Sequence, residues 1–322
     1  MIPLPTPQQL RYLLALVEHQ HFGRAAEACA VTQSTLSAGI LALERQLDAR
    51  LLDRDGGKHV AFTALGREIA TRAQAALLGL EAVVEAADAA RAPLSGILRL
   101  GVIPTIGPFL LPRLMPALRQ GYPGLRLYLR EDTTDRLVER LRDGRLDLLL
   151  LALPCGGAET VALARDAFVV ALPSAHPLAA RDSVPAAALQ GERLLLLEDG
   201  HCLRDQALDV CGFARGEGPR RDPAEPDGFA ATSLHTLVQM VAGGLGITLL
   251  PRIAVQAGIA AGTDLVLRPL AGAGGWRTLG LVWRPRSPRA AEYRALVPLM
   301  AQIAGQLPEP GGGNAGPSHQ AH

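Results

Sequence analysis

From residue 92 to residue 305 the sequence alternates between short apolar runs and segments with helical periodicity. The apolar runs include "ILRLGVIP", "RLDLLLLAL" and "AFVVALP", and the helical segments include "FLLPRLMPALRQGYP" and "TDRLVERLRDG". Strands that alternate with helices assemble into a parallel sheet of βαβ units. The alternation therefore predicts an α/β fold, here a two-lobed body over 92–305 with a ligand crevice at the strand ends.

Residues 1–62 have a different character. "PQQLRYLLALVEH", "FGRAAEACAV" and "TQSTLSAGILALERQL" each have the apolar spacing of a helix, and the short "AVTQS" suits the turn of a helix-turn-helix. In "RLLDRDGGKHVAFT" two extended pieces flank Asp55-Gly56-Gly57, which predicts a β-hairpin. A helix-turn-helix followed by a hairpin is a winged helix.

Residues 63–91 predict one long helix between head and body. Its apolar residues fall at positions 65, 69, 73, 77, 80, 84 and 87, and on an exposed connecting helix this spacing indicates a dimer seam. The alternative is a surface helix packed on its own domain. "APLSG" ends the helix, and the tail at 306–322 is too poor in apolar residues to pack, so we expect it to be disordered.

The head is a candidate for duplex DNA binding. A helix-turn-helix presents the start of its second helix to base edges in the major groove, and the residues there are Thr32, Gln33, Ser34, Thr35 and Ser37. Gln33 can pair with an adenine edge. Phosphates can be neutralised by Arg24, Arg50, Arg54 and Lys58. Residues 1–91 hold nine basic and ten acidic side chains, so charge leaves a protein-binding head open as the alternative.

The head "QLRYLLALVEHQHFGRAAEACAVTQSTLSAGILALERQLDARLLDR", followed by "FTALG", resembles the head of LysR-type transcriptional regulators, and "GGLGITLLP" is similar to a signature later in that family. The resemblance covers residues ~7–305. It implies a winged helix-turn-helix, a dimerising linker helix and a two-lobed regulatory domain like the periplasmic binding proteins. It also implies a homotetramer built from homodimers on a double-stranded DNA operator, with RNA polymerase as a further partner.

Two of the four cysteines, Cys202 and Cys211, stand nine positions apart in "EDGHCLRDQALDVC". The start of the chain does not read as a signal peptide and no apolar run reaches ~20 residues, so we expect a cytoplasmic protein without a membrane partner or a structural disulfide framework. The residues between the two cysteines suit a helix, which would hold their Cα atoms ~13 Å apart on opposite faces. A disulfide needs roughly 4.4–6.8 Å. A bond between them would unwind the segment and create a two-state switch.

Cys202 has neighbours that favour thiol chemistry. His201 and Arg204 flank it near the predicted helix start, and cations and helix N-termini both stabilise a thiolate. A peroxide would oxidise such a thiolate to sulfenic acid, which a second thiol, most simply Cys211, converts to a disulfide. From the residues alone, two ordinary buried thiols remain an alternative, as does a zinc site whose spacing fits poorly. We expect no metal and no cofactor.

The segment "LLLLEDGHCLRDQALDVC" resembles the redox segment of the hydrogen-peroxide-sensing members of the LysR family. That resemblance implies that Cys202 is the peroxidatic cysteine and Cys211 the resolving one. "GVIPTIGPFLLP" and "RTLGLVWRP" are similar to other segments of those proteins, which implies that Thr105 and Arg277 help His201 and Asp205 bind peroxide. They would polarise the O–O bond as charge develops on the leaving oxygen. For each of these four residues, the alternative to peroxide binding is a purely structural contact.

Together these features predict a hydrogen-peroxide-sensing transcriptional activator of oxidative-stress genes, switched by a reversible Cys202–Cys211 disulfide and reset by a disulfide-reducing system. The first alternative is a LysR-type regulator that responds to a small-molecule effector with non-redox cysteines. The second is a thiol peroxidase, although we expect no enzyme because a sensor reacts about once per oxidation cycle. The third, a solute-binding receptor, is opposed by the winged head.

Overall fold

The computed structural model describes residues 4–53, 60–91, 93–213, 230–272 and 275–305. The chain divides into two compact units, Met1–Arg91 and Ala92–His322. In the described part of the chain, no helix combines the length and the apolarity needed to cross a bilayer.

The first unit is a winged helix-turn-helix with a long helix, as predicted. Its helices and strands are α1 (Pro7–His19), α2 (Phe22–Ala28), α3 (Gln33–Leu47), β1 (Leu52–Asp53), β2 (Ala61–Phe62) and α4 (Ala64–Arg91). Thr6 and Gln9 form a capping box at the start of α1, which satisfies donors that the first helical turn leaves free. β1 and β2 pair antiparallel, which confirms the hairpin, while its tip at 55–57 lies outside the described residues.

The long helix α4 packs partly on its own unit. Ala73 and Leu77, two positions of the expected seam, are buried in the core of the first unit. Leu80, Val83 and Val84 are exposed further along the helix. The first half of α4 therefore completes the head, as the surface-helix alternative expected. The dimer seam stays a prediction for the second half.

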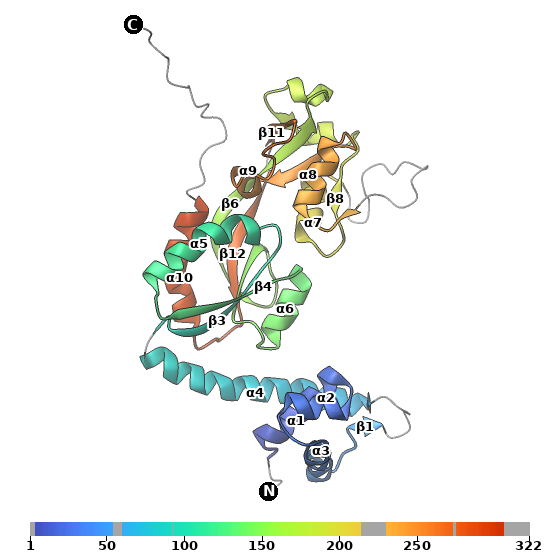
Figure 1. Ribbon diagram of the computed structural model, residues 1–322, viewed down its shortest axis with the longest axis vertical. Coiled ribbons are helices and arrows are strands. Elements are labelled where there is room, and N and C mark those ends of the chain that lie inside the picture. Colours follow the sequence, from blue (N-terminus) through green and yellow to red (C-terminus); the bar gives the residue numbers. More distant parts are fainter. Residues whose placement is uncertain (1–3, 54–59, 92, 214–229, 273–274, 306–322) are drawn as a thin grey trace. The chain divides into compact units, whose positions relative to one another are not determined.

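The second unit is a two-lobed α/β structure, which confirms the predicted fold class (Figure 1). Its strands are β3 (Gly96–Val102), β4 (Leu125–Glu131), β5 (Leu148–Leu153), β6 (Glu159–Pro173), β7 (Val184–Pro185), β8 (Leu196–Leu197), β9 (Ala230–Ala231), β10 (Thr248–Pro251), β11 (Leu265–Ala271) and β12 (Trp276–Trp283). Its helices are α5 (Gly107–Gly121), α6 (Thr134–Arg142), η1 (Pro177–Ala180), η2 (Ala186–Leu189), α7 (Cys202–Val210), α8 (Leu234–Ala242), α9 (Arg252–Gln256) and α10 (Ala290–Gly305).

The long strand β6 and its partner β12 connect the two lobes (Figure 1). The first lobe contains β3, β4, β5, α5, α6 and α10, and the second contains β7 to β11, α7, α8 and α9. In the main sheet the strand order is β4-β3-β5-β12-β6-β11-β7, and β10 also pairs with β6. The prediction of a parallel sheet is correct for β3, β4 and β5, but β12 pairs antiparallel with both β5 and β6, and β10 and β11 pair antiparallel with β6. The sheet is mixed because β6 and β12 run through both lobes as one antiparallel pair.

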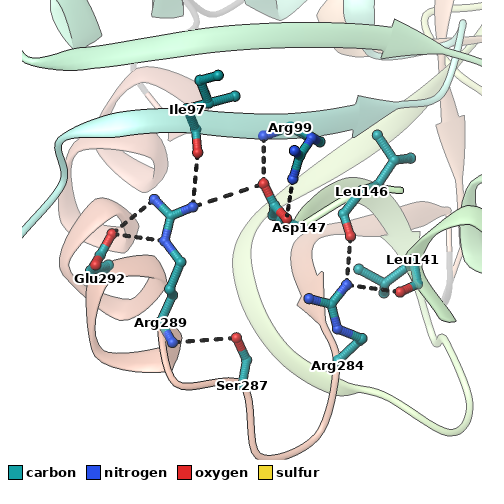
Figure 2. A network of polar contacts seen from close by, with 9 residues as sticks. All are labelled: Ile97, Arg99, Leu141, Leu146, Asp147, Arg284, Ser287, Arg289 and Glu292. Atoms are coloured by element: carbon teal, nitrogen blue, oxygen red, sulfur yellow. Dashed lines mark hydrogen bonds and ion pairs between the residues drawn. The ribbon is translucent and has the colours of Figure 1, made fainter. Parts of the chain in front are cut away.

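A buried ion network closes the base of the first lobe (Figure 2). Arg289 at the start of α10 donates from Nε and Nη2 to Glu292 Oε2 at 3.2 and 3.0 Å, and from Nη1 to the Ile97 carbonyl at 2.9 Å. Its Nη1 also lies 3.8 Å from Asp147 Oδ2. Burial opposes the charge of Arg289, but Tyr293, Glu292 and Asp147 outweigh it and raise the arginine pKa. The network ties α10 to β3, the first strand after the long helix.

Candidate functional site

The two cysteines of the predicted switch lie at opposite ends of an intact helix. α7 starts at Cys202 and Cys211 is its C-cap, which confirms that the residues between them are helical. Both thiols are free. Nine residues at 1.5 Å per residue separate the two Cα atoms by ~13 Å, beyond the reach of a disulfide. Joining the two sulfurs therefore requires part of α7 to unwind.

Cys202 is the first residue of α7 and is partly buried. The positive end of the helix dipole lies at this position and favours an anion there. His201, the N-cap, is buried, and its Nε2 lies 3.8 Å from Glu198 Oε1. Arg204 turns back to the preceding loop, where its Nε lies 2.9 Å from Asp199 Oδ1 and its Nη1 donates to the Leu197 carbonyl at 3.1 Å. These contacts fix the loop that leads into the helix.

Cys211 has a different environment from Cys202. Its exposed fraction is 1%, and burial raises the pKa of its thiol to about 11. At neutral pH the side chain is therefore a protonated thiol, which is a poor nucleophile.

Thr105 and Arg277, predicted from distant segments, meet in a buried cluster between the lobes. Arg277 donates from Nη1 to Thr105 Oγ1 at 2.7 Å and from Nη2 to the Thr105 carbonyl at 2.8 Å. Its Nε donates to Asp166 Oδ2 at 2.9 Å, in a pair that is 0% and 2% exposed. Asp166 is directly opposite Arg277 in the β6–β12 ladder, and its Oδ1 accepts from the Ile253 amide at 3.0 Å. The carboxylate thus orients the guanidinium and caps α9.

The sequence analysis missed Asp166 and also Thr134. Thr134 Oγ1, at the start of α6, is buried and forms no hydrogen bond within the described residues. The neighbouring Thr133 faces the loop before α7, because a Cβ placed on Gly200 would lie 3.8 Å from Thr133 Cγ2. The start of α6 in the first lobe and the start of α7 in the second therefore meet. The "TT" pair after a predicted strand was the available signal for this position.

A second contact joins the two lobes. The rings of Phe109 on α5 and His235 on α8 stack with their centroids 5.9 Å apart. α8 in turn packs on β8, the strand against which α7 also packs (Figure 1).

The four residues predicted to bind peroxide do not form one contiguous group. Thr105 and Arg277 contact each other, and His201 is buried beside Cys202. Asp205 is exposed in the first turn of α7, and within the described residues no hydrogen bond joins His201 or Asp205 to Thr105 or Arg277. The four side chains thus form two polar groups, one where β6 and β12 join the lobes and one at the start of α7.

In the first unit, the predicted DNA-contacting residues gather at the start of α3. Thr32 is the N-cap; its Oγ1 accepts from the Thr35 amide at 3.2 Å and lies 2.9 Å from Ser34 Oγ. Gln33 is exposed in the same turn. Of the other predicted contacts, Arg24 and Arg50 are exposed, Ser37 is partly exposed, and Arg54 and Lys58 lie outside the described residues. The exposed start of a second helix is the geometry of a major-groove reader.

The fold and these two sites define a transcriptional regulator that joins a helix-turn-helix head to a two-lobed α/β body. Residues 7–67 match the family model "Bacterial regulatory helix-turn-helix protein, lysR family", and residues 91–304 match "LysR substrate binding domain". The chain belongs to the LysR family of transcriptional regulators, as the sequence resemblance implied.

Within that family the chain is similar to OxyR proteins. It is 42% identical to a "Probable hydrogen peroxide-inducible genes activator" of Streptomyces viridosporus, over 94% of this chain and 96% of the relative. It is 43% identical to "DNA-binding transcriptional dual regulator OxyR" of Escherichia coli (strain K12), over 90% of this chain and 92% of the relative.

Solved OxyR structures have the same fold. A full-length cysteine-to-aspartate variant of OxyR from Pseudomonas aeruginosa superposes with a TM-score of 0.72 at 34% identity, covering 95% of this chain and 99% of that one. A cysteine-to-serine variant of Corynebacterium glutamicum OxyR, with bound hydrogen peroxide, superposes with a TM-score of 0.62 at 33% identity, covering 95% of each chain.

Proposed function

We propose that this LysR-family regulator senses hydrogen peroxide through a reversible Cys202–Cys211 disulfide and thereby controls oxidative-stress genes, acting in the cytoplasm as a transcription factor and not as an enzyme. One observation carries the proposal: the two free thiols occupy the two ends of one helix, so that a disulfide and an intact α7 exclude each other. The similarity to hydrogen peroxide-inducible activators supports the choice of oxidant.

The chemistry proceeds in two balanced steps. The Cys202 thiolate attacks one oxygen of the peroxide, so that an S–O bond forms, the O–O bond breaks and hydroxide leaves. Cys202 is then a sulfenic acid, and the sulfur has given up two electrons to the peroxide. Cys211 next attacks the Cys202 sulfur. The S–S bond forms as the S–O bond breaks, and the hydroxyl leaves as water with the proton of Cys211.

Thr105, Asp166 and Arg277 form a buried group that we call the hinge cluster, and it has hydrogen-bond donors for the leaving oxygen of the peroxide. Thr105 Oγ1 accepts a hydrogen bond from Arg277, so its own hydroxyl proton points elsewhere. Three of the five guanidinium donors of Arg277 are used by Asp166 and Thr105, which leaves two without an acceptor among the described residues. Such donors stabilise negative charge as the O–O bond breaks. We assign the same donor role to His201 and Thr134. A carboxylate such as Asp205 accepts hydrogen bonds, so Asp205 would instead hold the peroxide by accepting from its O–H, once a shift of α7 brings it close.

Disulfide formation would change DNA binding through the way the subunits of an oligomer are arranged. We propose a homodimer formed through the exposed apolar part of α4, with dimers paired into a homotetramer on a double-stranded operator. Unwinding of α7 would change how the regulatory lobes pair and so alter the spacing of the heads. Thr32, Gln33, Ser34, Thr35 and Ser37 would contact bases, and Arg24, Arg50, Arg54 and Lys58 phosphates. RNA polymerase would be the downstream partner, and a cellular disulfide reductant would reset the switch.

The test compares operator footprints of the wild type and Cys202→Ser, each before and after brief treatment with micromolar peroxide. The proposal expects the wild-type footprint to change and that of Cys202→Ser to stay as it was. A peroxide response that survives in Cys202→Ser would remove this cysteine from the mechanism. A wild-type footprint that changes only when a small metabolite is added would favour a non-redox LysR-type regulator. Sustained turnover of peroxide in the presence of a reductant would indicate a thiol peroxidase.

A further inference from the structure

The C-terminal end of α7 is held by a side chain that plays no part in the peroxide chemistry. Gln190, the C-cap of η2, donates from Nε2 to the carbonyl oxygen of Cys211 at 3.1 Å. This carbonyl belongs to the end of a helix, where the last carbonyls have no donor within the helix. Gln190 therefore supplies, from 21 positions earlier in the chain, the partner that α7 cannot provide.

The turn after Cys211 is shaped to admit this amide. The Phe213 amide donates to the Leu208 carbonyl and the Gly212 amide to the Asp209 carbonyl, each at 3.1 Å, which is the bond pattern of a Schellman motif. Gly212 has a φ of +74°, and a Cβ there would lie 3.1 Å from Gln190 Nε2. Glycine is needed both for the left-handed backbone and for the close approach of the glutamine.

The Gln190 hydrogen bond belongs to the dithiol conformation. Since the two cysteines are ~13 Å apart along α7, closing the disulfide must displace the chain at one end of the helix or both. At the start of α7, Arg204 binds Asp199 and Leu197, which lie in the adjacent loop and can move together with Cys202. At the end, Gln190 belongs to a separate segment, so moving Cys211 breaks its bond and the Schellman turn.

We propose that Gln190 is a positioning residue that holds Cys211 in the dithiol conformation and so sets how readily the switch closes. This inference rests on the proposed function. The glutamine exchanges no electrons with the cysteines. Its hydrogen bond lowers the fraction of molecules in which the Cys211 sulfur can reach the sulfenic acid of Cys202. The same bond stabilises the dithiol form relative to the disulfide form.

The expected effect follows from the loss of one neutral hydrogen bond, which changes an equilibrium constant roughly fivefold. Removing the amide destabilises only the dithiol form, so the ratio of disulfide to dithiol at a given redox buffer should rise about fivefold. For a two-electron couple this lowers the reduction potential by about 20 mV. Disulfide closure should accelerate by up to the same factor, while formation of the Cys202 sulfenic acid should keep its rate.

The experiment uses the full-length protein and the variants Gln190→Ala and Gln190→Glu. The second variant keeps the size of the side chain but cannot donate a hydrogen bond. The matched control is Gln120→Ala, an exposed glutamine at the end of α5. Each protein is equilibrated in glutathione buffers and its Cys202–Cys211 disulfide is counted by mass spectrometry. Rapid trapping with a sulfenic-acid reagent separates the oxidation of Cys202 from disulfide closure.

Both Gln190 variants should show the lower potential and faster closure, with sulfenic-acid formation and the Gln120→Ala control unchanged. Potentials equal to that of the wild type would overturn the role of Gln190 while leaving the switch itself intact. An equal acceleration of both steps would also overturn it, because that result indicates general loosening of α7. A wild type that never forms the disulfide would instead refute the proposed function.

Discussion

Replacing Asp166 by asparagine isolates the charge that holds the hinge cluster together. The asparagine keeps the shape of the side chain and an oxygen for the Ile253 amide. It leaves the Arg277 side chain, which is 0% exposed, without its only ion-pair partner among the described residues. Removing one partner of a buried ion pair costs about 3–5 kcal/mol, because the remaining charge stays desolvated. We take the lower end of that range, about 3 kcal/mol, since the hydrogen bonds from Arg277 to Thr105 survive.

For a domain of this size, about 3 kcal/mol corresponds to a decrease in Tm of roughly 6–12 °C. The assay is thermal and urea unfolding of the wild type and Asp166→Asn under reducing conditions. Asp182→Asn, at an exposed aspartate of the same lobe, serves as the control and should stay within about 0.5 kcal/mol of the wild type. If Asp166→Asn matched that control, the buried pair would not hold the hinge and this reasoning would be wrong.

Three further outcomes can be measured separately. Burial raises the pKa of Cys211 from 9.0 to about 11, so between these pH values the unfolded state loses a proton that the folded state keeps. The free energy of unfolding should therefore fall with pH more steeply in the wild type than in Cys211→Ala, and parallel curves would contradict this. Thr134→Val removes a buried hydroxyl that has no described partner, so the free energy of unfolding should stay the same or rise by about 1 kcal/mol. The reaction of Cys202 with peroxide should slow, and an unchanged rate would exclude Thr134 from the site. Gln33→Ala should weaken operator binding by about 1–3 kcal/mol and relax discrimination at one base pair, which a panel of mutated operators would detect.

Local patterns predicted the parts of the molecule that depend on neighbours in sequence. The winged head follows from helical spacing and a turn of fixed length, and α7 follows from a helix-compatible run between Cys202 and Cys211. The peroxidatic and resolving roles came from resemblance, and they stay predictions.

The remaining features depend on contacts between distant segments. Asp166 is 111 positions from Arg277, and only the register of β6 and β12 places the two side chains opposite each other. Gln190 directly follows a short 3-10 segment, and no local sequence pattern indicates that its side chain caps another helix. The apolar positions of α4 form one seam in sequence, yet the head buries Ala73 and Leu77 from its own side. Periodicity gives the faces of a helix, but packing decides which partner covers each face.

Hydrogen exchange of the α7 amides, before and after stoichiometric peroxide, tests the central claim most directly. In the dithiol form the Cys211 amide is bonded to the Ala207 carbonyl at 3.1 Å, so the last turn of α7 should be protected. The account predicts that this protection disappears as the Cys202–Cys211 disulfide forms and returns on reduction. A fully formed disulfide in a protein whose α7 amides remain protected would contradict it.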